Sequence, residues 1–146
     1  DVFYIGGTKC GSLFGEAVVV PERGSIRQFV THMKQHGALL AKGRLLGVQF
    51  EALFEEGLYL TIGEPAVKAT ARIREALKRA GYVVTMDSPT NLTFVALDQA
   101  GHERLSDKVC YSIWETLPDG RLLARIGTSW ATPEEDVVAF EQALAR

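Results

Sequence analysis

The sequence predicts a chain of α/β to α+β class, built in two parts. Residues 1–62 open with two apolar segments on either side of a glycine-rich turn, GGTKCG, and continue with helical patterns. Residues 63–146 combine helical patterns with four short apolar segments bounded by turn signals. That order favours a small antiparallel sheet covered by helices in the second part. We therefore expect a boundary between residues 62 and 63.

The first part is expected to run strand, loop, strand, helix, helix. The strands are predicted at Val2 to Ile5 and at Leu13 to Val20, whose β-branched end is followed by a proline. A helix is predicted over residues 25–37, where Ser and Gln stand at the spacing of a capping box. Residues 38–56 carry apolar side chains on more than one helical face, which predicts a helix buried on several sides.

The second part begins, by its sequence, with a chain break and a helix. Gly63 to Pro65 predicts the break, and the following helix is expected to end at Gly81. A closing helix is predicted after Thr132, with Pro133 at its first position and a capping box. Between the helices, four strands are predicted at Tyr82 to Thr85, Leu92 to Leu97, Val109 to Trp114 and Leu122 to Gly127.

Composition and charge exclude several classes of partner. The formal net charge is −2, from 18 acidic and 16 basic residues that are scattered along the chain, so no basic stripe is available for nucleic acid. No apolar run is long enough to cross a bilayer, and we expect no membrane partner and a cytoplasmic location. The two cysteines, Cys10 and Cys110, lack metal-ligand spacing and suit a reducing compartment, so no metal is expected.

Lys9 is the candidate reactive residue. It lies in GGTKCG between the two predicted strands, where glycines permit close backbone approaches that would present one amine to a ligand. An amine that loses hydration in a partly apolar turn is a better Schiff-base nucleophile. A surface lysine in a tight turn is the alternative from spacing alone. A nucleotide-binding loop fits less well, because the glycine spacing before the lysine differs from GxxxxGK[ST].

Several segments in order resemble the threonine aldolase and β-eliminating lyase family, a group of pyridoxal phosphate (PLP) enzymes of fold type I. The first is DVFYIGGTKCGSLFGEAVVV, the next is GALLAKGRLLGVQFEALF, and DSPTN and ARIGTSWATPEEDV follow. The resemblance implies that residues 1–62 are the end of the PLP-binding large domain and that residues 63–146 are the small C-terminal domain. It also implies a lyase that cleaves β-hydroxy-α-amino acids such as threonine or allo-threonine.

The same resemblance implies roles for three residues. Lys9 is expected to carry PLP as a Schiff base and to move protons. Arg125 occupies the position of an arginine that grips the substrate α-carboxylate, a task that suits the planar fork of a guanidinium. Thr8 is expected to donate its hydroxyl to the cofactor phosphate. Without the family, Arg125 would be read as a surface ion-pair partner and Thr8 as a turn residue that bonds the backbone.

The expected site is incomplete within this sequence. The groups that face the pyridine nitrogen, stack on the ring and bind the phosphate normally precede the lysine, and only eight residues do so here. We therefore expect the isolated chain to be inactive, and the parent protein, with its N-terminal part, to be a homodimer or homotetramer. β-Elimination, amino-group transfer, or a non-catalytic dimerisation and interaction domain remain the alternatives.

Overall fold

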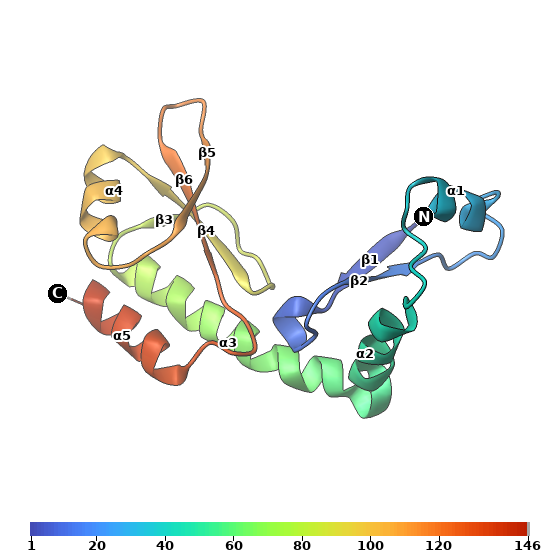
Figure 1. Cartoon of the computed structure of the whole chain (residues 1–146). Coiled ribbons are helices and arrows are strands. Elements are labelled where there is room, and N and C mark those ends of the chain that lie inside the picture. Colours follow the sequence, from blue (N-terminus) through green and yellow to red (C-terminus); the bar gives the residue numbers. More distant parts are fainter. Residues whose placement is uncertain (146) are drawn as a thin grey trace. The chain divides into compact units, whose positions relative to one another are not determined.

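The computed structural model describes residues 1–145 and divides the chain into two compact units (Figure 1). Unit 1 is Asp1–Thr61 and unit 2 is Ile62–Arg146. Each unit is described by itself below. Among the described residues, no helix combines the length and the apolar character needed to cross a membrane.

Unit 1 is built on an antiparallel hairpin. Strand β1 (Phe3–Gly6) pairs with β2 (Glu16–Val19), with Phe3 opposite Val19 and Gly6 opposite Glu16. The predicted order of strand, lysine loop and strand is therefore confirmed. The second strand is shorter than expected, because Gly15 adopts φ +91°, a left-handed conformation that interrupts an extended chain. Between the strands lies the short 3₁₀ helix η1 (Thr8–Cys10).

The helices of unit 1 are shorter than their apolar patterns predict. Helix α1 (Phe29–Gln35) starts after Gln28, which has φ 52° and makes no side-chain cap, so the capping box proposed at residues 25–28 is wrong. Helix α2 spans Arg44–Phe54 and is followed by the 3₁₀ turn η2 (Glu55–Gly57). Within α2 only Phe50 and Leu53 are buried. The prediction that the helix of residues 38–56 is buried on several sides is therefore also wrong for this chain by itself.

Helix α3 (Leu58–Arg79) runs through the predicted break. Pro65 lies inside it, although proline removes a backbone donor and disfavours a helix interior. The residues that follow explain why the helix persists, because Ala66, Thr70, Ile73 and Leu77 repeat at helical spacing and are buried. The helix ends where Gly81 adopts φ +83°, and Tyr82 N–H donates to the Leu77 carbonyl at 3.0 Å, so the predicted end is confirmed.

Unit 2 contains a four-stranded antiparallel sheet in the order β3, β4, β6, β5. The strands are β3 (Val83–Val84), β4 (Leu92–Leu97), β5 (Ser112–Thr116) and β6 (Leu122–Gly127). The central pair is in continuous register, from Leu92 opposite Gly127 to Leu97 opposite Leu122. The predicted α+β arrangement is confirmed. The two central strands have the predicted bounds, whereas β5 begins three residues later than expected.

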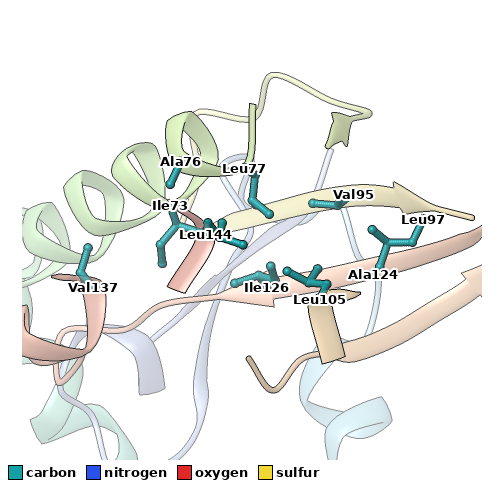
Figure 2. Close-up of a cluster of buried hydrophobic side chains, with 10 residues drawn as sticks. All are labelled: Ile73, Ala76, Leu77, Val95, Leu97, Leu105, Ala124, Ile126, Val137 and Leu144. Atoms are coloured by element: carbon teal, nitrogen blue, oxygen red, sulfur yellow. The ribbon is translucent and has the colours of Figure 1, made fainter. Parts of the chain in front are cut away.

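The core of unit 2 lies between one face of this sheet and three helices. Figure 2 shows side chains of α3 above the strands, together with those of α4 (Gln99–Ser106) and α5 (Glu134–Leu144). The cluster consists of Ile73, Ala76, Leu77, Val95, Leu97, Leu105, Ala124, Ile126, Val137 and Leu144. Burial of each large aliphatic member contributes about 1.5–3 kcal/mol relative to exposure.

Two buried polar groups fasten α3 to the sheet. The Thr128 hydroxyl donates to the Ala66 carbonyl at 2.6 Å and lies 2.7 Å from the Thr70 hydroxyl. The Arg74 guanidinium donates to the Thr93 hydroxyl at 3.1 Å and to the Ser88 carbonyl. These bonds satisfy groups that would otherwise be costly to bury. They also fix the segment that leads into β4.

In the two remaining helices of unit 2, α4 and α5, capping signals in the sequence were missed or misinterpreted. Helix α4 was not predicted, although Asp98 accepts a hydrogen bond from Gly101 N–H at 2.6 Å as its N-cap. The closing helix α5 is confirmed, but its capping box is wrong. Pro133 is the N-cap residue, and the Thr132 hydroxyl instead accepts a hydrogen bond from Ser129 N–H at 2.8 Å.

Candidate functional site

The lysine loop, residues 7–15, joins the two strands of the hairpin in unit 1. The Gly7 carbonyl accepts hydrogen bonds from Cys10 N–H at 2.9 Å and from Ser12 N–H at 3.0 Å, which closes the turn η1. Gly11 follows with φ 97°, the left-handed conformation that glycine adopts without strain. These bonds place Thr8 and Lys9 side by side on the outside of the turn.

Gly7 is needed here for space. A Cβ atom at this position would lie 2.3 Å from the Ser12 hydroxyl oxygen and 3.0 Å from the Phe50 ring. Phe50 belongs to α2, so the loop is packed against that helix. The Ser12 hydroxyl itself is buried and has no hydrogen-bond partner among the described residues.

Two further side chains hold the base of the loop. The Tyr59 hydroxyl, from the start of α3, donates to the Gly6 carbonyl at 2.9 Å. Burial, together with a hydrogen bond to the Cys10 thiol, raises the pKa of Tyr59 above 10.0. On the other side, Gln49 of α2 accepts from Leu13 N–H at 2.7 Å and donates to the Phe14 carbonyl at 3.3 Å. Sequence reasoning missed these contacts, because they join residues far apart in the chain.

Lys9 and Thr8 are both exposed. Within residues 1–145, no hydrogen bond or ion pair engages the Lys9 amine. The apolar surroundings that we expected to desolvate the amine are therefore not supplied by unit 1 by itself. The chemistry of the loop does suit a cofactor that carries an aldehyde and a phosphate, because a primary amine and a hydroxyl stand on adjacent residues and neither bonds another described residue.

Arg125 lies in the centre of the unit 2 sheet, on β6. It stands opposite Phe94 of β4 and Ser112 of β5, and its side chain is half-buried. Its guanidinium carbon lies 4.7 Å from the centre of the Trp114 ring. In the described part of the chain, no carboxylate pairs with it. The alternative of a surface ion pair thus finds no support in this structure, and a guanidinium with free donors can bind an anion.

Comparison with known proteins identifies a relative that matches the whole chain. No protein-family model and no curated protein matches the sequence. Among solved structures, the chain is similar to the threonine aldolase of Leishmania major, with 36% sequence identity and a TM-score of 0.86. That match covers 100% of this chain and 43% of the aldolase chain. A second match, to Sphingomonas wittichii serine palmitoyltransferase, has 20% identity and a TM-score of 0.48 over 66% of this chain and 27% of that chain.

The match includes the lysine hairpin and the antiparallel sheet, since it covers every residue. It therefore shows that the chain shares its α+β fold with a portion of that aldolase. The chain belongs to the threonine aldolase family, which confirms the family resemblance carried by GGTKCG and ARIGTSW. It spans 43% of the length of the relative it matches.

Proposed function

We propose that the protein containing this chain uses PLP to cleave a β-hydroxy-α-amino acid, such as threonine or allo-threonine, into glycine and acetaldehyde. The observation that carries the proposal is the match of this whole chain to 43% of a threonine aldolase, at 36% identity and a TM-score of 0.86. The lysine loop gives independent support, because its one amine is exposed and unpaired within the described residues. A homodimer or homotetramer in the cytoplasm, with the amino-acid substrate as its partner, completes the proposal.

Lys9 and Thr8 are proposed to hold the cofactor. With the cofactor bound, the Lys9 amine would condense with its aldehyde with loss of water, and the Thr8 hydroxyl would donate to a phosphate oxygen. PLP, when bound, supplies an electron sink for the bond that breaks at the substrate Cα. The hairpin orients the amine, since Tyr59 and Gln49 bind the backbone at the two ends of the loop. Once a substrate amino group had taken its place at the cofactor, the Lys9 amine would be free to take up or return a proton at the substrate Cα.

Arg125 is proposed to bind the substrate α-carboxylate. A guanidinium can offer two parallel N–H donors to the two carboxylate oxygens, which fixes orientation as well as affinity. Orientation matters because the choice of bond cleaved at Cα depends on how the substrate is held. In the proposed reaction the β-hydroxyl gives its proton to a base and the Cα–Cβ bond breaks with its electron pair left at Cα. The aldehyde leaves, and a proton added at Cα completes glycine.

The proposal is tested on a longer form of the protein that carries the N-terminal part. Threonine and allo-threonine are supplied with PLP, and acetaldehyde and glycine are measured. We expect release of both products, and loss of activity by at least a factor of about 100, the scale of one general acid–base group, in Lys9→Ala. Lys42→Ala, which removes another exposed lysine of unit 1, is the control and should retain activity.

Three outcomes would contradict the proposal. Equal turnover by Lys9→Ala removes the lysine from the mechanism. A keto acid in place of an aldehyde would indicate β-elimination if ammonia is released with it, and amino-group transfer if it is not. No turnover of any β-hydroxy amino acid would leave an interaction domain as the better interpretation. For the 146-residue chain alone, borohydride reduction in the presence of PLP should give no stoichiometric pyridoxyl label on Lys9.

A further inference from the structure

The guanidinium of Arg125 is held by an aromatic ring. Its central carbon lies over the Trp114 ring at 4.7 Å from the ring centre. Arginine favours this arrangement, because the face of an indole carries negative partial charge. Trp114 contributes no carboxylate oxygen, so the contact orients the cation without neutralising its charge. All of these groups belong to unit 2.

A β-bulge brings Trp114 to this position. In β5, Ser112 pairs with Arg125 and Ile113 pairs with Ala124, but the next pair is Glu115 with Leu123. Trp114 is therefore the inserted residue of an edge strand, with no partner of its own in the register. Bulges redirect a side chain away from the regular alternation of a strand. Ser112, which is small, stands opposite Arg125 in the register.

Phe94 holds the indole in place. Its ring centre lies 6.2 Å from that of Trp114, at an interplanar angle of 75°, the edge-to-face geometry that aromatic pairs prefer. Phe94 is also the residue opposite Arg125 on β4. Three side chains from three adjacent strands thus form one cluster, in which Phe94 contacts Trp114 and Trp114 contacts Arg125.

The strand that carries Arg125 is itself fixed by the core. Ala124 and Ile126, its neighbours in sequence, are buried on the opposite face among the aliphatic residues shown in Figure 2. The backbone is therefore rigid, and the freedom that remains to Arg125 is that of its long side chain. A contact that restricts those rotamers lowers the entropy lost when the guanidinium binds an anion.

We propose that Trp114 is a positioning residue, which holds the Arg125 guanidinium ready for a substrate carboxylate. This inference rests on the proposed function, because it assigns Trp114 a role only through Arg125. Trp114 contacts no reacting atom in this scheme. Trp114 as a residue is 56% exposed, so the cluster is accessible from solvent in this chain.

The test compares three variants in a form of the protein that cleaves threonine. Trp114→Leu removes the aromatic face and should raise KM for threonine about two- to fivefold, the range expected for one exposed cation–π contact, with kcat within about twofold of the parent. Trp114→Phe keeps a ring and should have a smaller effect. Ile113→Ala, at the neighbouring edge position that is 44% exposed, is the control for disturbance of β5.

Arg125→Leu separates failure of the inference from failure of the proposed function. It should raise KM by about tenfold or more, because it removes a charged hydrogen-bonding group. If Arg125→Leu leaves KM unchanged, the carboxylate role of Arg125 is wrong and the Trp114 role falls with it. If Arg125→Leu raises KM but Trp114→Leu does not, only the Trp114 inference is overturned.

A second readout uses the 146-residue chain alone and no substrate. The Arg125 Nε–H proton lies near an aromatic face, so its NMR signal should be shifted upfield by the ring current in the parent chain and in Trp114→Phe. In Trp114→Leu the shift should be lost, while urea unfolding followed by Trp130 fluorescence should stay unchanged. If that unfolding shows that Trp114→Leu is misfolded, Trp114→Met takes its place in both assays. An unshifted signal in the parent chain would overturn the proposal.

Discussion

Replacing Leu77 tests whether the aliphatic cluster between α3 and the sheet stabilises unit 2. Leu77 is 0% exposed and lies in that cluster. Leu→Ala at buried sites costs about 2–5 kcal/mol, and complete burial places Leu77 in the upper half of that range, at about 3–5 kcal/mol. A domain of this size has a free energy of unfolding of about 4–13 kcal/mol, so the loss is a large share of the total.

Fluorescence is a selective assay for this experiment. The chain has two tryptophans, Trp114 and Trp130, and both lie in unit 2. Urea unfolding followed by their emission therefore reports on unit 2 and not on unit 1. With a slope of about 1–1.5 kcal/mol per molar urea, we expect Leu77→Ala to lower the midpoint by about 2–5 M, or to unfold the unit in buffer.

The control truncates an exposed aliphatic residue of the same helix within unit 2. Val67 belongs to α3 and to unit 2 and is 41% exposed, so Val67→Ala should move the midpoint by less than about 1 M. Equal midpoints for Leu77→Ala and Val67→Ala would refute the reasoning, because the expected contrast depends on the burial of Leu77.

Three further changes test other contacts. Thr128→Val removes the buried hydroxyl that donates to the α3 backbone and should cost about 1–3 kcal/mol in the same urea assay. Glu141→Gln tests an ion pair, since the hydrogen bond from Arg72 lowers the pKa of Glu141 below 4.5. A lowered pKa stabilises the fold above pH 4.5, and that stability is lost as pH falls through the folded-state pKa, so the variant should show a smaller loss of stability on acidification. Gly7→Ala inserts a methyl group 2.3 Å from the Ser12 hydroxyl and should shift the amide NMR signals of the whole lysine loop.

Each of these changes has a matched control. Thr85→Val removes an exposed hydroxyl that donates to a strand carbonyl at 3.3 Å, and a loss as large as that of Thr128→Val would show that burial is not the cause. Glu135→Gln, in the first turn of the same helix, should leave the acid sensitivity as it is in the parent. Gly6→Ala meets no atom within 4 Å, so loop shifts equal to those of Gly7→Ala would argue against a steric explanation.

The elements that the sequence predicted best are those with a repeating apolar pattern. β4 and β6 have the predicted bounds because they are central strands, whose alternate residues enter the core. Helix ends were predicted less well. Thr132 has the right type and spacing for a capping box, yet its hydroxyl bonds Ser129, because several local acceptors and donors compete for the same side chain. Helix α4 was missed because its eight residues carry only a short pattern.

For the candidate site as well, local features could be predicted from the sequence and contacts between distant residues could not. Lys9 and Thr8 could be proposed from a local motif, and the structure places both on the exposed turn of the lysine loop. Their functional roles stay predictions, as does that of Arg125. The contact between Trp114 and Arg125 could not be predicted, because it depends on one inserted residue in β5. The register between two strands cannot be read from the sequence of either strand alone.

Gly6 pairs with Glu16, so the pairing of the two strands holds the ends of the lysine loop close together. The chain entropy that is lost when these ends are brought together is therefore lost when the hairpin forms, before any ligand binds. Lys9 is three residues from Gly6, so its Cα atom stays within about 11 Å of the Gly6 Cα atom however the loop fluctuates. The two short strands therefore limit the volume that the Lys9 amine can reach. This limit is a property of the hairpin itself.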